Sequence, residues 1–304
     1  MSIHSLLTKP LDRRTFAVGS ALSIAGVAAL GTLTLPGIAA AAETEYPELL
    51  VVAKDYAFEL PETVEAGFTN VTLENQGADA HHAVFLKLND GVTVDQVAAA
   101  KNEVEVLAQG VSLGGGFANP MGGKNTIVMN LEEGNYAVLC LIPGPDGMPH
   151  YQMGMIAPLT VTAGTSTAVA PTADLKIELM EMMFHNLPET LAAGPTTWEV
   201  TNTGVAVHEM VVLQLAEGVT GEQAIAMLAG IGSDATPEAS PVAEQAGPPP
   251  FSLVGVAAPM SPGHTIYAPL DLVPGNYFTV CFVFDPASGM PHALIGMQMP
   301  FTVE

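Results

Sequence analysis

The residues best suited to chemistry are two cysteines, and each stands at the head of the same short pattern. Residues 140–155 read CLIPGPDGMPHYQMGM, and residues 281–297 read CFVFDPASGMPHALIGM. In each stretch a Gly-Met-Pro-His segment follows the cysteine and a Gly-Met pair closes the stretch. Thiolate, imidazole and thioether groups are borderline or soft ligands for a transition metal. The spacing therefore predicts a metal-binding loop in each half of the chain.

The two halves are repeats of one another, and their alignment supplies a second imidazole for each loop. VTLENQGADAHHAVFLKLNDGVT in the first half matches EVTNTGVAVHEMVVLQLAEGVT in the second, which pairs His81 with His208 and His82 with Glu209. Two imidazoles and a thiolate, with a weak axial thioether, form the ligand set of a blue (type 1) copper site. We therefore predict four ligands in each repeat: His81, Cys140, His150, Met155, His208, Cys281, His292 and Met297.

The repeats also predict the fold. Short alternating runs rich in β-branched residues stop at Gly-Asn and Asn-x-Gly turns, which is typical of strands. Apolar residues at helical spacing indicate one helix at Val94–Leu107 and one at Gly221–Leu228, whereas Gly114–Gly116 is expected to form a turn. We predict a mainly-β chain of two tandem Greek-key β-sandwich domains, each with one short helix between strands.

The expected domain limits follow from the extent of the repeat. The first domain is expected at 43–165 and the second at 166–304, because the aligned motifs cover both segments. The offset between the copies grows toward their ends, so the second copy must carry extra residues. We place that insertion at 232–250, a polar, proline-rich stretch.

Residues 1–42 are predicted to be an export signal. Asp12-Arg13-Arg14-Thr15-Phe16 precedes a weakly apolar run that ends in small residues, as in a twin-arginine signal peptide. An ordinary secretory peptide or an uncleaved membrane anchor is the alternative. No later segment is long and apolar enough to span a bilayer. The mature protein is therefore expected to be periplasmic, secreted or at the cell surface.

On these motifs the sequence resembles the cupredoxin family. The resemblance covers both repeats and rests on Cys-x9-His-x4-Met at 140–155, Cys-x10-His-x4-Met at 281–297, and the earlier histidines His81 and His208. It implies one type 1 copper per domain. The distance from cysteine to loop histidine is longer than in the small electron carriers of the family and looks more like that of two-domain copper nitrite reductases. The resemblance does not select a subfamily.

Ordinary structural roles stay open for the same residues. A disulfide between Cys140 and Cys281 is disfavoured because equivalent buried points of two domains rarely lie within bridging distance. Cysteine and methionine also pack as soft core residues, so a scaffold without metal is a further alternative. Met155 is preferred to Met153 as the axial ligand because Met297 occupies the matching position in the second repeat.

The resemblance also raises an enzymatic alternative, since nitrite reductases and multicopper oxidases are built from the same repeats. Those enzymes place a histidine beside the cysteine, which connects the thiolate to a catalytic copper. Here the neighbours of the cysteines are apolar: Leu139, Leu141, Val280 and Phe282. Apart from the signal segment and the predicted ligands, the histidines are scattered: His82, His185 and His264. A catalytic site would have to form at an oligomer interface.

The charge balance restricts the partners. The chain carries 31 acidic and 8 basic residues, a formal net charge of −23, which disfavours nucleic acid and anionic membranes. We expect one-electron transfer with a redox partner protein, and the acidic surface fits either a basic partner or a salt-rich habitat. The alternatives are a copper-binding or structural module without redox cycling and, with less support, an interface oxidase or nitrite reductase. The oligomeric state stays open.

Overall fold

A computed structural model gives the fold. It describes residues 46–119, 121–144, 146–231 and 250–304. The predicted signal segment, 1–42, lies outside the described residues, as does nearly all of the predicted insertion at 232–250. No helix in the described part is long and apolar enough to cross a membrane.

Within the described residues, eighteen strands form two sheets, and each half of the chain contributes nine. The first half forms β1 (Glu48–Lys54), β2 (Ala57–Glu59), β3 (Thr63–Glu65), β4 (Gly67–Asn75), β5 (His81–Leu88), β6 (Gly110–Ala118), β7 (Lys124–Leu131), β8 (Gly134–Leu139) and β9 (Ile156–Thr162). The second forms β10 (Leu175–Met180), β11 (Met183–His185), β12 (Thr190–Leu191), β13 (Gly194–Asn202), β14 (His208–Leu215), β15 (Phe251–Met260), β16 (Thr265–Leu272), β17 (Gly275–Val280) and β18 (Gln298–Val303).

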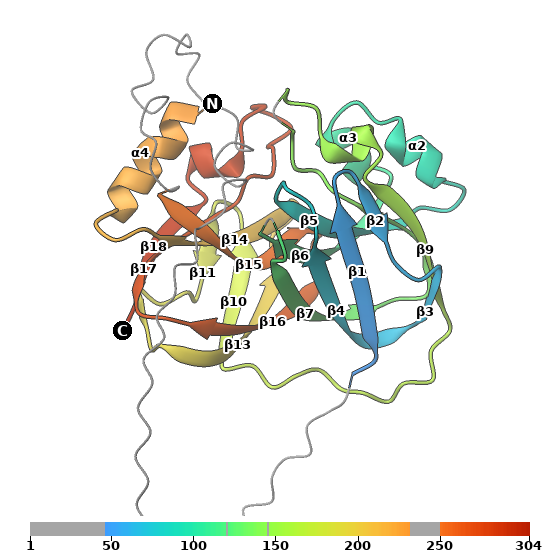
Figure 1. Cartoon of the computed structure of the whole chain (residues 1–304), viewed down its shortest axis with the longest axis horizontal. Helices are drawn as coiled ribbons and strands as arrows, with labels where there is room; N and C mark the ends of the chain where they lie inside the picture. The colour runs from blue at the N-terminus through green and yellow to red at the C-terminus, as the bar shows by residue number, and fades with distance from the viewer. Residues whose placement is uncertain (1–45, 120, 145, 232–249) are drawn as a thin grey trace, which may run out of the picture.

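Across each sheet, the strands of the second half follow the same order as those of the first half, but in the mirror-image direction. One sheet runs β11-β10-β13-β16-β7-β4-β1-β2, and the other runs β12-β18-β17-β14-β15-β6-β5-β8-β9-β3. Each sheet is therefore two equivalent half-sheets joined edge to edge, at β16–β7 in one and at β15–β6 in the other (Figure 1). The predicted class, mainly β with two tandem sandwich units, is confirmed. The domain limits at 43–165 and 166–304 stay predictions.

The burial of the strands explains the sequence patterns. β4 alternates between buried and half-buried residues, as a strand with one face on the core should. β5 and β14, by contrast, are buried at nearly every position, as strands covered on both faces should be. The first residue of each of these two central strands is a predicted metal ligand, His81 or His208.

The helix expected over 94–107 is instead two short helices, α2 (Val94–Ala98) and α3 (Glu103–Leu107). The Asn102 side chain accepts the N–H of Glu105 and starts the second helix, as asparagine does at an N-cap. Between the helices the Ala100 carbonyl accepts the hydroxyl of Tyr151 at 2.8 Å instead of continuing the helix. The interruption therefore ties this segment to the loop that follows Cys140.

Two further local predictions can be compared with the structure. The expected helix at 221–228 is present as α4 (Gly221–Ile231). The Gly114–Gly116 segment is not a turn but lies within β6, beside a register shift in its pairing with β5. A Cβ on Gly115 would collide with the carbonyl oxygen of Ala83, so the close approach of the strands requires glycine there.

Buried polar contacts lock the two halves together where β6 meets β15. The Ser112 hydroxyl donates to the Pro259 carbonyl at 2.5 Å, and the backbone N–H of Ser112 donates to Ser261 Oγ at 3.0 Å. Asn119 Nδ2 donates to the Leu253 carbonyl at 2.7 Å. Since these bonds join the halves, the described residues should unfold as one unit.

Ser112→Ala tests this junction. Loss of the hydroxyl bond to the Pro259 carbonyl should lower the free energy of unfolding by about 1–3 kcal/mol, measured by denaturant titration. Ser166→Ala is the matched control, because the Ser166 hydroxyl is exposed and accepts only the nearby N–H of Ala168. Equal stabilities of the two variants would contradict the assignment.

Candidate metal centres

The first candidate centre is built by the turn of chain between β8 and β9. Cys140 follows the end of β8, and the loop returns through η1 (His150–Met153), a short 3-10 helix, before β9. Three backbone bonds close the loop on itself: Cys140 donates to Met155, Met155 to His150 and Tyr151 to Cys140, at 2.9–3.1 Å. They hold the three loop residues predicted as ligands next to one another in the backbone.

The second loop repeats this closure. Cys281 donates its N–H to the Met297 carbonyl at 3.2 Å, Met297 donates to His292 at 2.9 Å, and Ala293 donates to Cys281 at 2.7 Å. The short helix here is η2 (His292–Ile295), and Gly296 after it has a φ of 119°. The same glycine conformation follows η1, so both Gly-Met pairs mark the end of a 3-10 helix.

The donor atoms of the first centre form a small buried triangle. His81 Nδ1 lies 3.1 Å from His150 Nδ1, and Cys140 Sγ lies 4.0 Å and 3.5 Å from these two nitrogens. All three side chains are fully buried. A point equidistant from the three atoms lies about 2.1 Å from each, which matches metal–nitrogen bonds of about 2.0–2.1 Å and is about 0.2 Å short of a metal–sulfur bond of about 2.3 Å. The residues therefore fit a metal ion of this size.

The second centre has the same dimensions where they can be compared. His208 Nδ1 lies 3.1 Å from His292 Nδ1, and Cys281 Sγ lies 3.5 Å from His292 Nδ1. All donor atoms of each trio lie within 4.8 Å of one another. Both cysteines are free thiols, so the disulfide alternative is not observed. Met155 and Met297 are completely buried in the closed loops beside them.

An Asn-x-Gly turn, present in both repeats, places the first histidine of each trio. Asn75 is buried and donates its side-chain amide to the Asp79 and Ala118 carbonyls while accepting the N–H of Gly77. Asn202 makes the equivalent bonds to Ala206, Met260 and Gly204. Because every polar atom of these amides is used, the turn delivers His81 or His208 in one conformation.

An acidic side chain contacts the outer nitrogen of each of these histidines. Asp55 Oδ1 lies 2.7 Å from His81 Nε2, and Glu181 Oε1 lies 3.6 Å from His208 Nε2. A carboxylate at Nε2 favours the tautomer whose free Nδ1 lone pair faces the sulfur. A Cβ on Gly77 or Gly204 would intrude between carboxylate and imidazole, which explains the glycine at both turns.

The same carboxylates are held in their ionised form. Burial opposes ionisation of Asp55, but hydrogen bonds from the N–H of Ala78, from His81 and from the N–H of Asp79 leave its pKa below the ordinary value. The backbone N–H groups of Val205 and Ala206 lower the pKa of Glu181 to about 2. The carboxylates of Asp55 and Glu181 are therefore both negatively charged at neutral pH.

The thiols, in contrast, are protonated when no metal is bound. Burial raises the pKa of Cys140 to about 12 and raises the pKa of Cys281 well above its ordinary range. Burial, with the neighbouring His292, also lowers the pKa of His208 to about 4, so this imidazole is neutral. A neutral imidazole can donate a lone pair to a metal, and binding to the sulfur must release the thiol proton.

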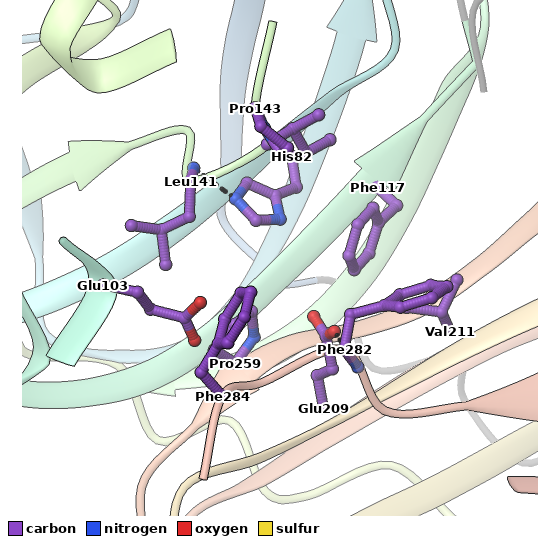
Figure 2. Close-up of a pocket in the computed structure, with 11 residues that line it drawn as sticks. His82, Glu103, Phe117, Leu141, Pro143, Glu209, Val211, Pro259, Phe282 and Phe284 are labelled. Atoms are coloured by element: carbon purple, nitrogen blue, oxygen red, sulfur yellow. Dashed lines mark hydrogen bonds between the residues drawn. The ribbon is translucent and has the colours of Figure 1, made fainter. Parts of the chain in front are cut away.

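The residues just after the first histidines face a cavity between the two repeats (Figure 2). His82 Nε2 accepts the N–H of Leu141 at 2.6 Å, and Glu209 Oε1 accepts the N–H of Phe282 at 2.7 Å. Each bond therefore holds the residue that directly follows a cysteine. The cavity is about 100 Å³ in volume and is walled mainly by apolar side chains, among them three phenylalanines and two prolines.

Ionisable groups in this cavity are kept neutral by burial. Burial lowers the pKa of His82 to about 3 and raises that of Glu103, on α3, to about 8. Burial and the nearby charge of Glu103 raise the pKa of Glu209 to about 8, although the N–H of Phe282 opposes the shift. The two cysteine loops thus approach each other across an uncharged, mostly apolar space.

Comparisons with known proteins give only weak likenesses. No protein-family model and no curated protein matches the chain. Auracyanin from the photosynthetic bacterium Roseiflexus castenholzii is 19% identical over 42% of this chain and 94% of its own, with a TM-score of 0.28. A Cu-containing nitrite reductase from Thermus scotoductus is 13% identical over 84% of this chain and 61% of its own, with a TM-score of 0.23.

A multicopper oxidase is 11% identical over 84% of this chain and 88% of its own, with a TM-score of 0.24. At these scores the likenesses carry no argument about family or activity. The functional assignment therefore rests on the side chains of the two centres.

The structure brings together six of the eight predicted ligands as donor trios and places the two methionines beside them in the loops. Sequence reasoning missed the carboxylates of Asp55 and Glu181. Both occupy the tight turn after the first strand of their repeat, but the 127-residue offset of the repeats pairs Asp55 with Met182, so the alignment does not bring the two carboxylates into register. Nothing in the local sequence of either turn indicates a contact with a histidine more than twenty positions away.

Asp55→Ala tests the outer contact of the first centre. Loss of a hydrogen-bonded carboxylate behind a metal-binding histidine should weaken metal affinity about 10–100-fold, measured by competition with a chelator. Glu181→Ala should weaken the second centre less, since its distance of 3.6 Å is longer. Equal affinities of wild type and Asp55→Ala would refute this role.

Glu103→Gln tests the neutral cavity. The carboxyl ionises at about pH 8 in the folded protein but near its ordinary value, 4.5, when unfolded. Between these values the folded state binds more protons, so the free energy of unfolding must fall as pH rises. Glu103→Gln should abolish this contribution. Between about pH 5 and about pH 8, its free energy of unfolding should therefore fall by about 1–2 kcal/mol less than that of the wild type.

Denaturant titrations across that pH range measure the effect, and Glu105→Gln on the exposed side of α3 is the control. A Glu103→Gln stability profile parallel to that of the wild type would contradict burial of the carboxyl.

Proposed function

We propose that this chain is an exported protein that holds one type 1 copper in each repeat and transfers single electrons. The observation that carries the proposal is the buried His–Cys–His trio, present twice with the same 3.1 Å and 3.5 Å distances. When bound, copper would supply a one-electron couple between Cu(I) and Cu(II). Mixed thiolate and imidazole donors suit both oxidation states.

The surroundings of each trio support redox cycling with little rearrangement. Backbone bonds close the ligand loop, and the Asn-x-Gly turn fixes the remaining histidine, so the donors are held in place by the fold. In the second centre the N–H of Glu209 donates to Cys281 Sγ at 3.4 Å, and in the first the N–H of His82 lowers the pKa of Cys140 against the effect of burial. Hydrogen bonds to the sulfur tune the potential of such a centre.

A partner would approach over the ligand loops. His150 and His292 are buried, with the Tyr56 ring packed 4.6 Å from that of His150, so electrons must pass through covering residues. Met148 and Met290, just before the Pro-His of each loop, are exposed and offer apolar contact surface. The net charge of −23 favours a basic partner, with an association rate that falls as salt rises.

Cys140→Ala and Cys281→Ala test the stoichiometry. The purified protein reconstituted with Cu(II) should be intensely coloured, and each substitution should remove one of the two coppers and part of the visible absorption. Metal analysis and the absorption spectrum measure both effects. A colourless protein that retains no copper would refute the proposal.

Voltammetry separates the electron carrier from a storage or delivery protein. A carrier should show a reversible one-electron wave from each centre, because its ligand geometry suits both oxidation states. Copper bound without a reversible wave would favour the non-redox alternative. More coppers than cysteines would favour the interface enzyme.

A further inference from the structure

The hairpin of β10 and β11 carries soft side chains on its outer face. The strands pair antiparallel at the edge of the eight-stranded sheet, with Met180 directly opposite Met183 and Glu178 opposite His185. Directly opposite residues point to the same face of the sheet, as do residues two apart along a strand. The intervening residues, Leu179 and Phe184, are buried on the other face.

These outer side chains are open to solvent and close enough to converge. Met180 is 36% exposed and Met183 is 49% exposed, and His185 is also exposed. Opposite residues have Cβ atoms about 4.5–5.5 Å apart, and His185 lies about 7 Å along the strand from Met183. Methionine and histidine side chains are long enough to bring two sulfurs and one nitrogen around a single ion.

The fold does not require these residues. The equivalent hairpin of the first repeat, β1–β2, places Lys54 opposite Ala57 and Val52 opposite Glu59. There the outer face is closed by an ion pair between Lys54 Nζ and Glu59 Oε1. The same backbone geometry thus carries a salt bridge in one repeat and two thioethers with an imidazole in the other.

The hairpin also lies beside the second buried centre. Its turn residue, Glu181, sits between the two methionines in sequence and reaches His208 Nε2 at 3.6 Å. Glu181 is anchored there by the N–H groups of Val205 and Ala206. The turn that presents Met180 and Met183 to solvent is therefore the same turn that covers a ligand of the buried centre.

We propose that Met180, Met183 and His185 form a solvent-accessible Cu(I) site at the edge of the second buried centre. Thioether donors select Cu(I) over harder ions, and the imidazole completes a three-coordinate set. The site captures the ion with no change in its charge and no covalent step. Its role as an entry point for copper rests on the proposed function, whereas the binding itself does not.

Nuclear magnetic resonance of the full chain labelled in the methionine methyl groups tests the site. Ag(I), a soft monovalent ion without redox chemistry, is titrated first and Cu(I) is then titrated under anaerobic conditions. The methyl signals of Met180 and Met183 should shift together with the ring signals of His185. Met121 is the internal control, since it is 58% exposed but belongs to another segment.

Met183→Leu removes one sulfur while keeping an apolar side chain of similar size. The Met180 methyl should then lose its response, and the dissociation constant of the exposed site should rise at least about tenfold. Met121→Leu is the matched variant and should leave both unchanged. The proposal is overturned if Met180 and Met183 respond no more than Met121, or if Met183→Leu leaves the Met180 response intact.

The same spectra separate this site from the buried centres. The methyl groups of Met155 and Met297 report the two ligand loops, and copper retention reports the cysteines. A response of Met180 and Met183 without any response of the loop methionines would refute the buried copper centres and support the exposed site. The reverse pattern would refute the exposed site alone.

Discussion

Two imidazole nitrogens held 3.1 Å apart beside a buried sulfur are the constraint on which the rest of the structure depends. Such a trio is costly to bury, because each polar atom needs a partner. The fold meets part of this cost with fixed contacts: a carboxylate near the outer nitrogen of His81 and of His208, a glycine turn that makes room for it, and a ligand loop closed by its own backbone. Removing any one of these contacts leaves a buried polar atom without its partner.

The mirrored joining of the repeats explains why both centres lie where they do. Because the half-sheets meet at β16–β7 and β15–β6, the central strands β5 and β14 run toward the same region between the repeats. Leu141 and Phe282, which follow the two cysteines, then line one cavity. There the side chain of His82 accepts the N–H of Leu141, and that of Glu209 accepts the N–H of Phe282. The repeats have diverged at this pair, imidazole in one and carboxyl in the other, and both are neutral in the buried setting.

Much of the candidate site could be predicted from the sequence, because the ligands repeat in type and order. The choice of His81 over His82 came from that alignment, and the structure places His81 in the trio and turns His82 to the Leu141 N–H. The carboxylate of Asp55 was not predictable, since its contact depends on how a hairpin folds over the turn at Gly77. The break between α2 and α3 was missed for a similar reason, as it depends on a tertiary bond from Tyr151.

The joining of the half-sheets also lay beyond the sequence, because edge pairing between repeats leaves no periodic signal of its own. What the repeats do show is where function has been changed within a shared frame. Equivalent hairpins carry Lys54 with Glu59 in one copy and Met180 with Met183 in the other. Differences of this kind identify surface chemistry that the fold itself does not explain.

The central claim is that a metal sits between the sulfur and the two nitrogens of each trio. X-ray absorption at the copper edge of the reconstituted protein measures this directly. We predict two imidazole nitrogens and one short sulfur bond as the nearest ligands of both coppers. Cys140→Ala or Cys281→Ala should each leave one copper with its sulfur bond, and the sulfur contribution should disappear only when both cysteines are replaced. A first shell of nitrogen and oxygen without sulfur would contradict it.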